Sequence, residues 1–173
     1  MTKTKDKQNN QMYYMVQDFH KAFKHKYSDT PTAIDKETAL NRTVWTGEEL
    51  VEFLYATVGG NTVEFLQLFE DFKEGLEHAC DKIVFNQPEV DDVIVAQADA
   101  LTDIEYFNQG TFNILGVEPF NLFKIVQNAN MGKLWEDSQP RYRKDGKIMK
   151  PPHWEEKYAP EPKLKEEIER QKG

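Results

Sequence analysis

The chain has 173 residues, of which 39% are apolar and 30% are charged, a composition typical of one globular domain with a sizeable core rather than of a disordered chain. Its formal net charge of -8 argues against binding to nucleic acid polymers through a broad basic surface. The single cysteine, Cys80, excludes an intrachain disulfide, and with no apolar leader and no apolar run of about 18 residues we expect a cytoplasmic protein that spans no membrane.

Apolar residues at helical spacing predict an all-α fold, a helical bundle followed by an irregular, partly basic C-terminal extension. We expect residues 1–10 to be disordered, and helices to cover about residues 11–24, 46–59, 62–85, 89–115 and 119–130, with a short helical turn near 35–42. Thr46 has the position of an N-cap, and Glu49 that of its capping-box partner. Pro119 and Gly132 bound the last of these helices.

The helix predicted at 89–115 carries apolar residues nearly all the way round, which is typical of a helix in the middle of a bundle. Composition then changes after Lys133, so we divide the chain into an all-α domain at 11–133 and an extension at 134–173 that packs on or near the functional site. Asp145-Gly146 predicts a small hairpin in the extension. The final stretch predicts a short exposed helix.

Two pairs of acids stand on predicted helices beside apolar residues. Glu49 and Glu52 share one side of the helix at 46–59, and Asp99 and Asp103 lie one turn apart on the helix at 89–115. If the two helices pack with these faces together, four carboxylates converge, and they stay charged only beside a cation. Oxygen ligands of this kind suit Mg²⁺ or Mn²⁺, which predicts metal-dependent cleavage of a phosphate anhydride.

Other interpretations of the acids remain open. Capping accounts for Glu49, and surface ion pairs account for the others, in which case the protein is a non-catalytic helical module that binds a nucleotide or a protein partner. Glu74 belongs to an acidic stripe that a solvated helix face explains, and it is kept only as an additional ligand candidate. A di-iron bundle needs Glu-x-x-His pairs on two helices. His78 has Gly75 three residues before it, and no other histidine has a glutamate at that offset, so the sequence does not favour a di-iron site.

In their order on an all-α background, the stretches E-E-L-V-E (48–52) and A-D-A-L-T-D-I (98–104) resemble the MazG-like superfamily of nucleoside triphosphate pyrophosphohydrolases. This superfamily includes all-α dUTPases and phosphoribosyl-ATP pyrophosphohydrolases. N-A-N-M-G-K-L and K-D-G-K-I-M-K-P-P extend the resemblance over roughly residues 12–155, to a poorly characterised bacterial branch. The chain departs from the Glu-x-x-Asp half of the signature, because Ala100 stands three residues before Asp103, and the gap between the halves is long.

The resemblance implies hydrolysis of an NTP or dNTP to the monophosphate and pyrophosphate in a homodimer, as a housecleaning activity that removes unwanted nucleotides. It implies that Mg²⁺, or Mn²⁺ in its place, is held by Glu49, Glu52, Asp99 and Asp103, with Glu49 or Glu52 as the catalytic residue that activates water. Asn130 and Lys133 match the N-M-x-K stretch of the family, and we expect them to contact the phosphate or the sugar of the substrate. Lys147 and Lys150 belong to the most basic patch of the chain, which either binds the triphosphate or is a solubilising loop. A phosphoribosyl-ATP substrate is the alternative with the same chemistry.

Overall fold

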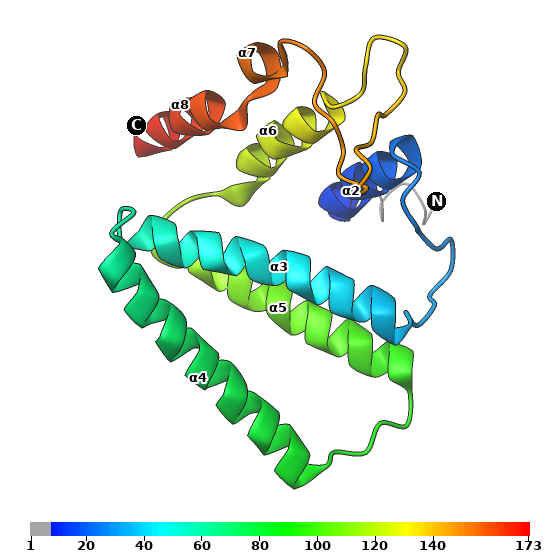
Figure 1. Cartoon of the computed structure of the whole chain (residues 1–173), viewed down its shortest axis with the longest axis vertical. Helices are drawn as coiled ribbons and strands as arrows, with labels where there is room; N and C mark the ends of the chain where they lie inside the picture. Colours follow the sequence, from blue (N-terminus) through cyan, green and yellow to red (C-terminus); the bar gives the residue numbers. More distant parts are fainter. Residues whose placement is uncertain (1–7) are drawn as a thin grey trace. The chain divides into compact units, whose positions relative to one another are not determined.

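The computed structural model describes residues 8–173; residues 1–7, which belong to the segment predicted to be disordered, lie outside the described residues. The predicted all-α class is confirmed. The helices are α2 (Gln11–Ala22), α3 (Lys36–Thr57), α4 (Thr62–Asn86), α5 (Val93–Leu115), α6 (Pro119–Met131), α7 (Trp154–Tyr158) and α8 (Pro160–Lys172) (Figure 1). β pairing within residues 8–173 is limited to a bridge between Tyr142 and Ile148. No helix in this part of the chain has the length and apolar character needed to cross a bilayer.

Helix α3 begins at Asp35, not at Thr46. Asp35 accepts hydrogen bonds from the Thr38 N–H at 2.8 Å and from the Thr38 hydroxyl at 2.9 Å, so its side chain caps the first turn. Thr46 lies inside the helix, where its hydroxyl donates to the Arg42 carbonyl at 3.1 Å. The predicted N-cap at Thr46 is therefore wrong, because the turn of helix after Asp35 continues without a break.

The other long helices begin and end close to the residues predicted from their capping patterns. Asn61 caps α4 by accepting the Val63 and Glu64 N–H groups. Helix α5 begins two to four residues later than predicted, because Asp92 accepts the Ile94 and Val95 N–H groups. Helix α6 runs from Pro119 to Met131 and ends at Gly132, as predicted.

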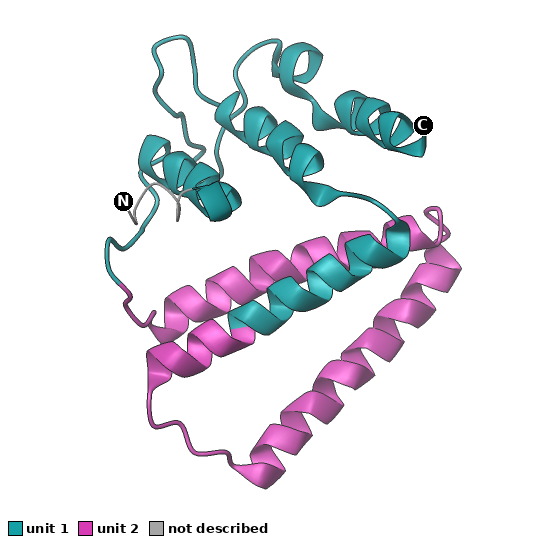
Figure 2. Ribbon diagram, turned by 180° about the vertical axis from the view of Figure 1, so that it is seen from behind, with its two compact units in different colours: residues 1–30, 101–173 teal, residues 31–100 magenta. Residues whose placement is uncertain are grey.

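The chain forms two compact units, one of residues 31–100 and one that joins residues 101–173 to the N-terminal segment ending at Thr30 (Figure 2). In the second of these, α2 and α8 both pack on α6. Phe23, Ala129 and Trp154 are the buried apolar residues among residues 8–173, and all three belong to this unit. The segment after residue 133 is therefore part of a packed unit, and it carries the helices α7 and α8 as well as a loop.

In the unit of residues 31–100, α3 packs on α4, and the rings of Tyr55 and Phe65 meet edge to face across their connection, 5.3 Å apart. No residue of this unit is buried. Several large apolar side chains of α5 are also exposed; Val95 has 62% and Phe107 72% of its surface open. The expectation that α5 lies in the middle of a bundle is thus not met within one chain.

Candidate active site

The acids of α3 lie in the interior of a long helix. Glu49 and Glu52 are three residues apart, so their side chains leave the helix on the same side, and both are exposed. Because the helix starts at Asp35, Glu49 is four turns from the N-terminus. The capping-box interpretation of Glu49 is therefore wrong, and no local structural role of that kind explains this carboxylate.

The acids of α5 lie early in that helix. Asp99 and Asp103 are separated by four residues, which places them one above the other on one side. Both are exposed, and the intervening Ala100 is small, so another helix can approach this surface closely. Asp92, and not either of these residues, caps the helix.

None of these four carboxylates forms an ion pair or a side-chain hydrogen bond with any of residues 8–173. Some other acids of the chain are neutralised: Asp137 pairs with Arg141 at 2.8 Å and Asp145 with Arg143 at 2.6 Å. Four exposed oxygen donors without a protein cation match the ligands that Mg²⁺ and Mn²⁺ prefer. Over residues 8–173, however, no three His, Cys, Asp or Glu side chains lie close enough together to hold a metal ion. One chain therefore contains the four carboxylates but does not bring them close together.

The predicted substrate residues lie at the end of α6 and in the loop that follows. Lys133 donates a hydrogen bond from its Nζ to Asn130 Oδ1 at 2.7 Å. Lys133 is half-buried, and this burial, together with the ammonium charges of Lys150 and Lys147, holds its pKa below the ordinary lysine value of 10.5. The structure thus brings the three lysines into one electrostatic cluster, which is suited to an anion.

Lys150 is held by a residue that the sequence analysis missed. Its Nζ lies 3.9 Å from the centroid of the Trp154 ring and 2.6 Å from Glu155 Oε1. Trp154 is buried and donates from Nε1 to the Ala129 carbonyl at 3.0 Å, which fixes the loop to the end of α6. A signal was present in the sequence, because P-P-H-W places a tryptophan in an otherwise polar, proline-containing segment.

The predicted hairpin forms around Asp145-Gly146. Lys147 O accepts the Arg143 N–H at 2.8 Å, and Arg141 O accepts the Met149 N–H at 2.8 Å. Both arginines pair with aspartates and Lys150 pairs with Glu155, so among the residues of the patch it is Lys147, together with Lys133, whose charge has no carboxylate partner within residues 8–173.

The hairpin is attached to α2 and to the turn after it. The Tyr142 hydroxyl donates to the Phe23 carbonyl, and Phe23 is the most deeply buried side chain of the described part. Gln127 of α6 also donates to the Met15 carbonyl of α2, at 2.7 Å. The loop that carries Lys147 therefore rests on packed helices.

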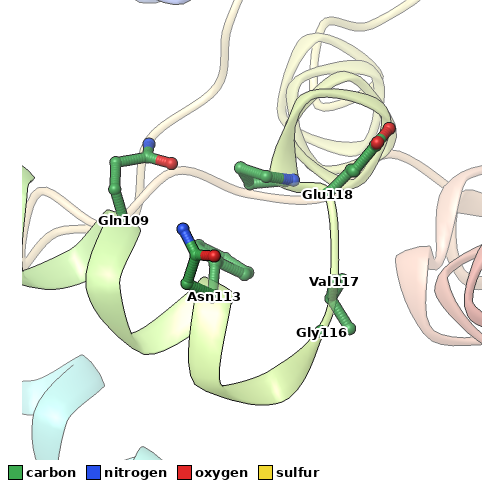
Figure 3. A pocket seen from close by; sticks show the side chains of 7 residues that line it. Gln109, Asn113, Gly116, Val117 and Glu118 are labelled. Atoms are coloured by element: carbon green, nitrogen blue, oxygen red, sulfur yellow. The ribbon is translucent and has the colours of Figure 1, made fainter.

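A hollow of about 200 Å³ lies at the corner between α5 and α6, within residues 101–173 (Figure 3). Gln109 and Asn113 of α5 line it together with Pro119 of α6, and Gly116 makes the turn with a φ of 68° that favours glycine. No predicted site residue lines this hollow, so we assign it no part in the predicted chemistry.

Two comparisons connect the chain to known proteins. The profile of the family described as phosphoribosyl-ATP pyrophosphohydrolase matches residues 16–130. In structure, the chain is similar to the crystal structure of a "putative NTP pyrophosphohydrolase" from Exiguobacterium sp. 255-15, with a TM-score of 0.85 and 44% identity over 92% of this chain and 95% of that chain. No curated protein matches the sequence. The matched family segment contains all four acids and Asn130, and it ends before the lysine cluster.

Proposed function

Because the chain belongs to the phosphoribosyl-ATP pyrophosphohydrolase family, within the MazG-like all-α superfamily, we propose that it is a metal-dependent NTP pyrophosphohydrolase. It takes an NTP or dNTP and water and releases the nucleoside monophosphate and pyrophosphate. The observation that carries the proposal is the set of four exposed carboxylates on α3 and α5 that no protein cation neutralises. An acid set of this kind is costly to bring together unless it binds a cation.

Glu49, Glu52, Asp99 and Asp103 are the residues that hold Mg²⁺ or Mn²⁺ in this proposal. When bound, the metal supplies positive charge for the phosphate oxygens and favours ionisation of water. Glu49 or Glu52 accepts the proton of the attacking water, since both are exposed and free of hydrogen bonds within residues 8–173.

The lysine cluster binds the phosphate chain. Lys133, Lys147 and Lys150 present three ammonium groups, and Asn130 orients Lys133 through its 2.7 Å hydrogen bond. An anion between these lysines would relieve their mutual repulsion. This electrostatic fit supports a polyphosphate ligand, and it is why the extension after residue 133 belongs to the site.

The active form is a homodimer. Residues 31–100 contain no buried side chain, although their helices carry large apolar residues that are about half exposed or more, among them Leu50, Phe53, Leu66, Leu76, Ile83, Phe85 and Val95. If each of about ten such residues loses roughly 80 Å² of exposed surface, they account for the ~800 Å² per partner of a stable interface. A monomer would leave this surface in water.

A second candidate substrate is phosphoribosyl-ATP. The observation in its favour is the description of the matching family itself. The bond that is hydrolysed is of the same kind, so this candidate changes the substrate and not the roles of the acids.

The test is pyrophosphate release from a panel of NTPs, dNTPs and phosphoribosyl-ATP with Mg²⁺ or Mn²⁺. We expect turnover of one or a few substrates, reduced by about a thousandfold or more in Asp103→Asn and Glu52→Gln. Glu105→Gln is the matched control, because it removes a charge from the same helix as Asp103 on a different side, and it should keep its activity. Absence of turnover with every substrate in a folded protein would refute the proposal and favour the binding module.

A further inference from the structure

The register between α3 and α5 is fixed by one side chain. Gln97, in the second turn of α5, accepts the Ile34 N–H and donates to the Ile34 carbonyl, both at 3.0 Å. Ile34 lies two residues before the first residue of α3. The start of α5 is therefore attached to the start of α3, and Asp99, only two residues beyond Gln97, lies near this end.

The α3 acids are far from that end. Glu49 lies thirteen residues beyond Lys36, or about 20 Å along the helix at 1.5 Å per residue. Both helices lead away from this attachment, and Figure 1 draws α3 and the first turns of α5 pointing the same way. Since Asp99 lies only about 3 Å past Gln97 while Glu49 lies about 20 Å from the start of α3, their backbones are on the order of 15 Å or more apart. Asp103 lies about 9 Å past Gln97, so its backbone is on the order of 10 Å or more from that of Glu49. Glu52 lies one turn further still.

This offset exceeds what the side chains can span. Ligands of one Mg²⁺ place their oxygens about 2.1 Å from the ion, so their backbones must lie within roughly 10 Å of one another. The offset accounts for the finding that no three acids gather at a metal-binding distance over residues 8–173. Within one chain, Asp99 is therefore beyond the reach of Glu49 and Glu52, and Asp103 is at the limit of that reach.

A second copy of the chain can supply the two acids that complete each metal site. The same helices expose an apolar surface and contain no buried residue across 31–100, so they require a cover, and the cover has to be apolar and helical. In a twofold dimer, the α5 of the partner can lie against α3 with the opposite direction, which removes the register limit that Gln97 imposes within one chain.

We propose that each metal site is shared between two copies, with Glu49 and Glu52 from one chain and Asp99 and Asp103 from the other. This inference rests on the proposed function, since it concerns the same acids. Each dimer then holds two equivalent sites related by the twofold axis. Neither chain completes a site alone, so dimerisation is a condition for metal binding and not only for stability.

Mixed dimers test the sharing. One chain carries Glu49→Gln and Glu52→Gln, the other carries Asp99→Asn and Asp103→Asn, and each has its own affinity tag so that co-expressed heterodimers are purified on both. With shared sites, one of the two sites receives all four mutations and the other receives none. We expect the heterodimer to bind Mn²⁺ at half the wild-type stoichiometry, measured by calorimetry without nucleotide, and to recover about half of the pyrophosphate release.

Three comparisons make the result decisive. Each doubly substituted homodimer should bind no Mn²⁺ at these sites, and a heterodimer of wild type with the Glu49→Gln, Glu52→Gln chain should bind half. A mixed heterodimer that binds no Mn²⁺ while wild type does overturns the sharing and leaves the proposed hydrolase intact. Wild type that is monomeric at micromolar concentration but binds Mn²⁺ overturns the sharing alone. Wild type that binds no Mn²⁺ overturns both the sharing and the metal-dependent function.

Discussion

Gly132 joins the end of α6 to the segment that carries the lysine cluster, and the ring of Tyr158 covers it. A Cβ added at Gly132 would lie 2.4 Å from Tyr158 Cγ, 2.5 Å from Cδ1 and 2.8 Å from Cδ2. Carbon atoms in contact are about 3.5–4.0 Å apart, so the methyl group of an alanine overlaps the ring by about 1 Å or more. Because Cγ is the ring atom nearest the backbone, a small ring rotation does not relieve the overlap.

Two effects of Gly132→Ala oppose each other. Gly132 has φ -63° and ψ -7°, a conformation that alanine adopts freely, so the loss of chain entropy in the unfolded state favours the variant by about 0.4–1 kcal/mol. Overpacking against Tyr158 destabilises it by about 1–3 kcal/mol. We expect the second effect to dominate and the free energy of unfolding to fall by about 1–2 kcal/mol.

Removing the ring should reverse the sign. In a Tyr158→Ala background the overlap is gone, so Gly132→Ala should raise the free energy of unfolding by about 0.4–1 kcal/mol. The assay is urea unfolding of the four proteins followed by circular dichroism, at one protein concentration because the stability of a dimer depends on it. The same sign in both backgrounds would refute the packing that places Tyr158 on Gly132.

Lys133→Met should leave the melting temperature unchanged or raise it, because it removes a half-buried charge that is repelled by Lys147 and Lys150. The same substitution should raise the KM for a nucleotide by about 10-fold or more. Scanning calorimetry and steady-state kinetics check the two effects, and a lower melting temperature would contradict the reasoning. Hydrogen bonds from Arg170, Gln171 and Asn121 lower the pKa of Glu167 to about 2 from an ordinary value of 4.5. The stability that this carboxylate provides is therefore complete above about pH 4.5 and is lost as the pH falls toward 2. Glu167→Gln should flatten the acid limb of a curve of stability against pH, and an unchanged limb would count against these contacts. Mn²⁺ at about 100 times its Kd should raise the melting temperature by about 5 °C, and EDTA should reverse the rise. Asp103→Asn should abolish the rise, whereas Glu105→Gln should keep it. An equal rise in both variants would place the ion elsewhere.

Helix ends show how far local sequence carried the prediction of the fold. Pro119 and Gly132 bound α6 as expected, because proline at a first turn and glycine after a last turn act within a few residues of themselves. Thr46 was wrongly predicted as an N-cap, since Asp35 already caps the helix that passes through it. Both residues have side chains suited to capping, and only the continuous backbone hydrogen bonding of α3 decides between them.

The candidate site was likewise predictable from the sequence only in part. The sequence alone places Glu49 and Glu52 on one side of a helix, and Asp99 and Asp103 on one side of another, because the helical repeat determines these directions. The family resemblance that these acids indicated is confirmed by the family match and by the similarity to the Exiguobacterium protein. The metal ligand set and the substrate residues stay predictions.

Tertiary structure decided the remaining features. The stacking of Lys150 on Trp154, and the effect of the Lys147 charge on the pKa of Lys133, need the loop to fold back on α6, and no local pattern encodes that return. The apolar surface of α5 predicted that the helix is covered, but it could not say by what: Phe107 is 72% exposed in its own chain. Hydrophobic burial depends on area and not on which chain provides the cover, so the sequence indicated that this surface needs a cover, and only the tertiary structure showed that residues 8–173 of one chain leave it exposed.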